Sequence, residues 1–190
     1  MTVAVRQFRR HILATVAALI VITAGLLPQA ASAASAAELR RDAQSALQRL
    51  YAKTPGARAL QKQAVAILVF PSITKAGLVV GGQFGEGVLF RSGKAVAYYN
   101  TAGASFGLQA GAQHYGYALF FLSEETLRYL DASDGFEVGV GPSVVVADEG
   151  FARSVTTTTM QDQIYAFIFD QHGAMAGLGI QGNKITRIQK

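Results

Sequence analysis

One short segment has the form of a catalytic motif. Residues 103–107 read Gly-Ala-Ser-Phe-Gly, the G-x-S-x-G pattern in which a sharp strand-to-helix turn exposes a nucleophilic serine. Asp148 or Asp162 and then His172 follow in the order that α/β-hydrolases use. The residues after this segment are glycine-rich and form a poor helix start, without alternating strands and helices around them. We therefore expect Ser105 to lie in a glycine-rich strand and the protein not to be an enzyme.

The other residue types that do chemistry are sparse or badly spaced. The chain has no Cys, which excludes disulfides and thiolate ligands. His114 and His172 lie far apart in the sequence, and neither has a second His or Cys within a few residues. Residues 82–87 (Gly-Gln-Phe-Gly-Glu-Gly) lack the Lys-Ser/Thr that completes a phosphate-binding loop, and a tight bend explains them better. The sequence predicts no metal site and no cofactor.

The N-terminal residues have the pattern of an export signal. Three arginines precede an apolar run over residues 12–27, and a stretch of Ala and Ser follows it. This order of basic, apolar and small residues is typical of a secretory signal peptide, with cleavage after Ala33 or Ala36. Two of the arginines are adjacent, as in a twin-arginine signal, and an uncleaved membrane anchor is the alternative. We expect a signal peptide over residues 1–36, one domain over residues 37–190, and a periplasmic protein peripheral to the envelope membrane.

The positive charge is concentrated in one part of that domain. The chain of 190 residues has 17 Lys and Arg against 12 Asp and Glu, a formal net charge of +5. Three of these basic residues belong to the expected signal, and residues 76–190 carry more acidic than basic residues. Residues 37–75 hold the excess: Arg40, Arg41, Arg49, Lys53, Arg58, Lys62 and Lys75. Because Tyr51 is the only aromatic residue of this segment before Phe70 and the protein is expected to be exported, we expect no nucleic-acid partner.

The first part of the domain has helical periodicity. Apolar residues recur at helical spacing on one stripe of residues 37–53, from Leu39 to Tyr51, with basic residues beside it. Ser35 and Glu38 have the spacing of a capping box, and residues 54–63 form a second short helix that begins at a Thr-Pro pair. A helix of this kind either lies on an anionic bilayer or docks on a sheet through its apolar stripe. The pattern alone favours docking on the sheet, with the membrane-bound helix as the alternative.

From residue 64 onwards the sequence predicts strands. Residues 64–70 form a continuous apolar run closed by a proline, typical of a buried strand. Glycines then recur every four residues, which lets a sheet bend sharply or a helix approach it closely. Hairpin turns are expected at residues 91–94, 170–173 and 181–184, and the last two make residues 163–188 a three-stranded meander. A further strand is expected at about residues 153–159, and one helix begins after Ser123. The predicted fold is α+β: a strongly curved antiparallel sheet or partly closed barrel, with N-terminal amphipathic helices and one inserted short helix.

Four ordered blocks of the sequence resemble the SYLF domain. Residues 66–77 (Ala-Ile-Leu-Val-Phe-Pro-Ser-Ile-Thr-Lys-Ala-Gly) and 80–89 are similar to its opening block, and residues 103–113 to its second. Residues 138–142, and then 164–167 with 173–177, look like the third and fourth. The resemblance covers about residues 38–190. It implies a lipid-binding module of the kind found in bacterial exported proteins and eukaryotic membrane-trafficking proteins, and it makes Ser105 part of a structural motif.

The resemblance also implies a site. SYLF domains bind phospholipids through a basic amphipathic N-terminal helix, which places lipid binding on Arg40, Arg41, Arg49 and Lys53, with Arg58, Lys62 and Lys75 as outer contributors. For an exported protein we expect an anionic phospholipid or membrane surface as the partner; protein partners stay unknown. The alternatives are a non-catalytic structural or interaction protein of the envelope, whose helix packs permanently on the sheet, and an outer-membrane barrel, which the absence of Trp disfavours.

Overall fold

The computed structural model describes residues 34–132, 136–137, 144–146 and 164–190. These residues lie in one compact unit that spans Ala34–Lys190. The helices and strands follow one another as α2 (Ala36–Lys53), α3 (Pro55–Gln61), β1 (Ala66–Arg91), β2 (Lys94–Phe121), α4 (Glu124–Ala132), β3 (Phe136–Glu137), β4 (Val144–Val146) and β5 (Ile164–Ile188). The α+β class, the two N-terminal helices and the inserted short helix are confirmed. An expected strand near residues 153–159 lies outside the described residues.

The sheet is built on β2. The strand order is β1-β2-β5-β3, all antiparallel, and the short β4 pairs in parallel with β5. β2 therefore has a partner along each edge, while β1 and β3 are the ends of the order. Because no pairing joins these ends among the described residues, the expected partly closed barrel is not confirmed. The predicted hairpin at residues 91–94 is confirmed: Arg91 pairs with Lys94, and Ser92 and Gly93 have φ values of 48° and 76°.

The predicted meander over residues 163–188 is wrong, because β5 is a single long strand. Its pairing with β2 continues on both sides of the supposed turn at 170–173, from Ile168↔Tyr117 to His172↔His114. Asp170 and Gly173 do adopt positive φ values, 49° and 95°, as turn residues would. The register shift opposite them shows that this backbone irregularity is a bulge, which kinks a strand without reversing it.

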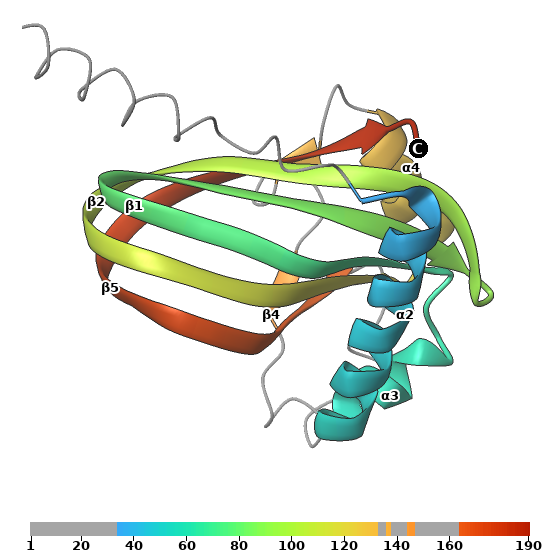
Figure 1. The fold of residues 1–190 in the computed structure, drawn as a ribbon. Helices are drawn as coiled ribbons and strands as arrows, with labels where there is room; N and C mark the ends of the chain where they lie inside the picture. Colours follow the sequence, from blue (N-terminus) through green and yellow to red (C-terminus); the bar gives the residue numbers. More distant parts are fainter. Residues whose placement is uncertain (1–33, 133–135, 138–143, 147–163) are drawn as a thin grey trace, which may run out of the picture. The chain divides into compact units, whose positions relative to one another are not determined.

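The two halves of β1 lie directly against each other. A Cβ atom on Gly85 would be 2.8 Å from Cγ1 of Ile73, and one on Gly87 would be 2.8 Å from the carbonyl oxygen of Val69. Only glycine permits backbones this close. Figure 1 shows β1, β2 and β5 each turning back at the same end of the sheet. We call this end the apex; in β1 it comprises residues 77–84.

Helices cover both faces of the strands at the other end. The apolar stripe of α2, including Leu39, Leu50 and Tyr51, is buried against a set of β1, β2 and β5 residues that includes Val69 and Phe120. The alternate residues of the same strands form a second core with Leu127 and Leu130 of α4. The period-two alternation of strand side chains thus gives each face its own helix. Of the two possibilities open for the α2 stripe, the structure has the docked one.

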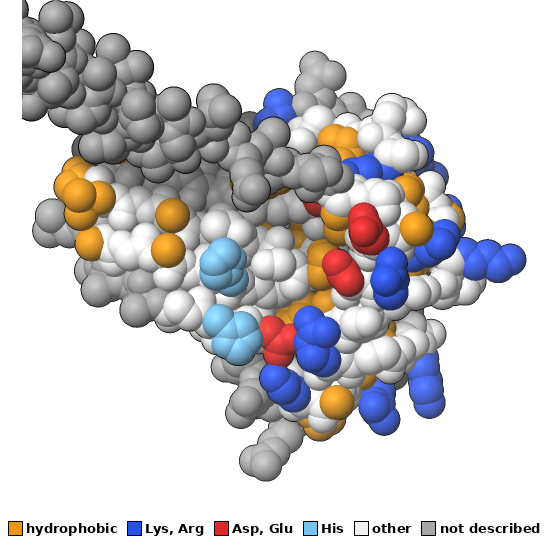
Figure 2. All heavy atoms as spheres, in the orientation of Figure 1, with side chains coloured by type: hydrophobic (Ala, Val, Ile, Leu, Met, Phe, Trp, Pro, Cys, Tyr) orange, Lys and Arg blue, Asp and Glu red, His pale blue; other side chains and the backbone are white. Residues whose placement is uncertain are grey.

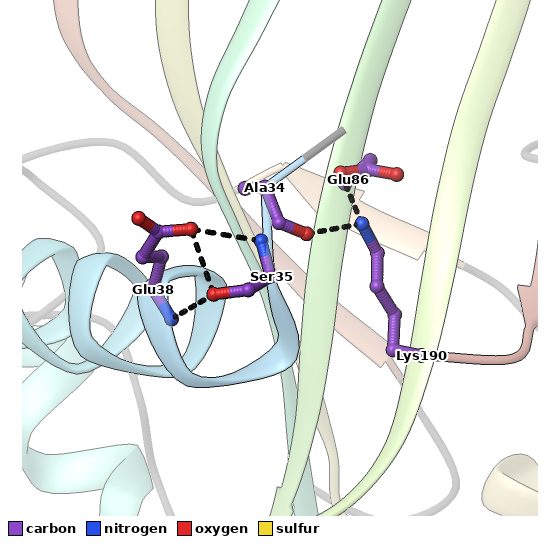
Figure 3. Close-up of polar contacts among 5 residues, drawn as sticks. All are labelled: Ala34, Ser35, Glu38, Glu86 and Lys190. Carbon is purple, nitrogen blue, oxygen red and sulfur yellow. Dashed lines mark hydrogen bonds and ion pairs between the residues drawn. The ribbon is translucent and has the colours of Figure 1, made fainter. Parts of the chain in front are cut away.

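Two sets of polar contacts hold the start of α2: its own capping box and the contacts of the C-terminal residue Lys190. The capping box is confirmed: the backbone N–H of Glu38 donates to Ser35 Oγ at 3.3 Å, and that of Ser35 donates to Glu38 Oε2 at 2.9 Å. These bonds from Ser35 lower the pKa of the Glu38 carboxyl. Figure 3 shows the Lys190 ammonium between the Ala34 carbonyl, at 2.6 Å, and the Glu86 carboxylate, at 2.8 Å. The segment before α2 is therefore tied to β1.

The contact between the halves of β1 predicts a difference between two glycines. In Gly87→Ala the new methyl group meets the Phe70 ring and a backbone carbonyl below 3 Å, so we expect a loss of roughly 1–3 kcal/mol in the free energy of unfolding. In Gly82→Ala the nearest atom is 3.8 Å away, and we expect a change within about 0.5 kcal/mol. Urea unfolding measures both. Equal losses would show that close approach is not what requires glycine at position 87.

Candidate functional site

The predicted basic residues divide into an exposed group, a paired group and an outlier. Six of the seven are exposed on α2, on α3 or at the C-cap of α3, and Figure 2 shows Lys and Arg side chains gathered over this end of the domain. Two of the six, Arg49 and Lys53, form ion pairs, and the other four make up the exposed group. We call these four the basic surface: Arg40, Arg41, Arg58 and Lys62. Lys75 lies on a different element, β1, where its Cα pairs with Gln113. The structure thus groups the helix residues and separates Lys75 from them.

Two of the predicted residues are engaged by an acid from β5. Arg49 Nε and Lys53 Nζ lie 2.6 and 2.7 Å from the two carboxylate oxygens of Asp170, whose side chain is 10 % exposed. Hydrogen bonds from Arg49 and then Lys53 hold the pKa of Asp170 below its ordinary value. Asp170 reaches them because its positive-φ bulge interrupts β5 beside the C-terminal half of α2. These two cations therefore join the helix to the sheet.

A groove opens between α2, α3 and the β1–β2 turn. Its volume is about 330 Å³, at the small end of the range of roughly 300–1,000 Å³ for ligand pockets. The lining combines apolar side chains with polar groups from Gln61, Lys62 and the turn residues. The lining residues are Leu47, Tyr51, Gln61, Lys62, Ala64, Ile67, Phe90, Ser92 and Gly93. Sequence reasoning did not predict the groove, because Ile67 and Phe90 come together only when β1 folds back.

Tyr51, one of the lining residues, has an unsatisfied hydroxyl. Tyr51 is 4 % exposed, its ring packs edge-on against Phe120, and within the described part of the chain its hydroxyl has no hydrogen-bond partner. Burial raises the pKa of Tyr51, so the hydroxyl stays protonated and can donate. Tyr115 differs, because its buried hydroxyl donates to Gln83 Oε1 at 2.9 Å. A buried hydroxyl without a partner costs stability and can serve a ligand.

Among the described residues, the serine motif does not form a nucleophile elbow and no metal-binding cluster is present. Ser105 lies inside β2, paired with Gly81 and Gln181, whereas a nucleophile elbow requires a turn into a helix. The described residues contain no cluster of three His, Asp or Glu that could hold a metal. In the same residues no helix is long and apolar enough to cross a membrane. The acids Asp148 and Asp162 lie outside the described residues.

Comparison with protein families agrees with the motif resemblance. Residues 102–190 match the family Ysc84, described as Las17-binding protein actin regulator. Residues 102–190 are therefore similar to a SYLF (Ysc84) domain. The match begins within β2 and runs through β5, so the helices that carry the basic surface and groove lie outside it. No curated protein matches the chain.

Two of the buried tyrosines, Tyr51 and Tyr115, predict opposite responses to loss of the hydroxyl. Tyr51→Phe removes an unpaired group, so we expect the free energy of unfolding to stay within about 0.5 kcal/mol or to rise. Tyr115→Phe leaves Gln83 Oε1 unpaired, and we expect a loss of about 1–2 kcal/mol. Chemical denaturation of both variants measures the difference. A substantial loss for Tyr51→Phe would mean that its hydroxyl already has a partner in the protein.

Asp170 predicts a pH dependence of stability. Because its pKa is lowered in the folded protein, the ion pairs contribute stability above the unfolded value of about 3.9, and this is lost as the pH falls through the folded value. Between pH 7 and 3, the free energy of unfolding should fall less in Asp170→Asn than in the unchanged protein. The double variant Arg49→Gln/Lys53→Gln should show the same flattening. Identical slopes in all three proteins would contradict this role of Asp170.

Proposed function

We propose that this protein is an exported, non-catalytic SYLF-domain protein that binds anionic phospholipid at the surface formed by α2, α3 and the groove. The observation that supports this most directly is the groove itself, whose lining includes apolar side chains, Tyr51 with its unpaired hydroxyl, and a cation, Lys62. An amphipathic anion fits these three features. Its negative headgroup meets the cations, and its acyl chain meets Leu47, Ile67 and Phe90.

Electrostatics support an anionic rather than a neutral headgroup. Arg58 and Lys62 are four residues apart and both exposed, so they lie on one side of the short helix and its cap. Arg40 and Arg41 add exposed positive charge at the start of α2. Each basic residue near an anionic bilayer contributes about 1 kcal/mol. Arg49 and Lys53 contribute less directly, because Asp170 neutralises them in part.

In this proposal the acyl chain does not contact the apolar stripe of α2, as it would if the helix lay flat on the membrane. Leu39, Leu50 and Tyr51 were candidates for contact with acyl chains, yet each is at most 4 % exposed within the core. Pulling α2 off the sheet would expose this stripe and break its contacts. In our proposal α2 stays docked, and only the groove and the exposed cations face the lipid.

The cellular setting of this proposal is the envelope. The basic, apolar and small residues of the first 36 positions support export to the periplasm, where the domain would be peripheral to a membrane. An exported protein does not meet actin, so the actin part of the family description does not enter the proposal. The docking of α2 also favours a second candidate, a structural or interaction protein of the envelope that does not bind lipid directly.

Removal of charge beside the groove decides between these candidates. In Arg58→Gln/Lys62→Gln the loss of two cations removes about 2 kcal/mol, so we expect roughly 30-fold weaker partitioning onto vesicles of phosphatidylglycerol and phosphatidylcholine. Co-sedimentation at low salt measures it, with pure phosphatidylcholine as the neutral surface. Arg128→Gln is the control, because Arg128 is exposed on α4, and it should change binding less than about twofold. Equal binding to both vesicle types would contradict the role of the cations, and no binding to either would favour the structural candidate.

A further inference from the structure

The apex carries most of the exposed apolar surface. Among the described residues seven large apolar or aromatic side chains are exposed, and four of them lie at this end of β1. Figure 2 shows an apolar group at the end of the long strands away from the Lys and Arg side chains. The four residues are Leu78 (75 % exposed), Val79 (48 %), Val80 (61 %) and Phe84 (52 %). Contiguous exposure of this kind marks a surface that another phase or molecule covers.

No charged residue interrupts the apex on any of its three strands. β1 has none between Lys75 and Glu86, β2 has none after Lys94, and β5 has none between Asp170 and Lys184. The other exposed positions described there are Ala or Gly, which offer no hydrogen-bonding side chain: Ala76, Gly82, Ala102, Ala104, Ala110, Gly111 and Ala112. A protein interface of standard size needs about one hydrogen bond per 100–200 Å², and these side chains provide none. Hydrocarbon requires no such bonds.

The backbone of the apex is largely paired within the sheet. Leu78 pairs with Ala110, Val80 with Phe106, and Phe106 in turn with Ile180. A segment that enters hydrocarbon must satisfy its backbone polar groups internally, and sheet pairing does this. Val79 is skipped in the register and has a φ of 66°, a conformation that β-branched residues rarely adopt. This local strain turns consecutive apolar side chains outward and fits a functional constraint.

Positive charge borders the apex. Lys75 lies on β1 three residues before Leu78, and Lys184 lies in the cross-strand row Phe84–Ala102–Lys184. The nearest acid on β1, Glu86, is engaged by Lys190 at 2.8 Å. An uncharged end followed by lysines matches the profile of an anionic bilayer, in which phosphates lie above the acyl chains.

We propose that the apex inserts into the hydrocarbon of an anionic bilayer, with Leu78, Val79 and Val80 among the acyl chains and Phe84 at their boundary with the headgroups. Lys75 and Lys184 then lie at the level of the phosphates. The inference rests on the proposed function, which makes an anionic bilayer the partner. It adds that the apex, and not the groove, is the part that enters the bilayer. Lys75, which lies on β1 apart from the basic surface, would then contact the lipid phosphates beside the apex.

A single-tryptophan experiment tests insertion, because the natural chain has no Trp. Phe84→Trp places the probe at the apex, and Tyr129→Trp on α4 is the control. Both are added to phosphatidylglycerol–phosphatidylcholine vesicles whose acyl chains carry bromine. We expect a blue shift and strong quenching for Phe84→Trp and little change for Tyr129→Trp. If the protein co-sediments but both probes stay unquenched, the apex proposal is wrong while lipid binding stands.

The other outcomes are equally informative. Absence of co-sedimentation with anionic vesicles would overturn the proposed function and this inference together. A Phe84→Trp probe that is already blue-shifted without lipid, in a protein that sediments as a dimer, would show that a second copy covers the apex. In a variant series, Leu78→Asn should weaken vesicle binding about tenfold. Ile168→Asn, at an exposed apolar site outside the apex, should change it less than about twofold.

Discussion

The backbone contact between the two halves of β1 is the constraint on which the rest of the structure depends. Gly85 and Gly87 let residues 85–90 lie against residues 66–73 of the same strand. This contact brings Val88 and Phe90 beside Ile67 and Val69, so that α2 covers both halves at once. The groove follows from it, since Ile67 and Phe90 line it together. The apex follows as well, because a strand that returns on itself must turn somewhere.

Local features were predictable from the sequence because their determinants are a few residues apart. The Ser35–Glu38 capping box, the helix that begins at Pro55 and the turn at Ser92–Gly93 all agree with the structure. The apolar stripe of α2 was also visible from its period, but what it packs against was not. An apolar stripe shows that one face of a helix is apolar, but it does not show whether lipid or a sheet covers that face. Only the structure decides in favour of the sheet.

The errors and omissions share a different physical origin. The residues at 170–173 have turn chemistry, yet pairing with β2 on both sides keeps β5 continuous, so tertiary pairing overrides the local preference. The Asp170 partner of Arg49 is 121 positions away, and no pattern within a helix indicates it. The glycines were informative because they predict close approach. They do not say which segment approaches, and in this fold it is the other half of the same strand.

The position of β5 has a consequence for how the domain assembles. β5 is the last strand in the sequence but occupies the middle of the sheet, paired with β2 from Tyr98↔Ile188 to Phe121↔Ile164. Until residues 164–188 have emerged during synthesis, one entire edge of β2 stays open, and such an edge pairs readily with other chains. The most distant contacts must form late, which slows folding. The nascent chain is therefore exposed to aggregation in this interval, when a chaperone would protect it.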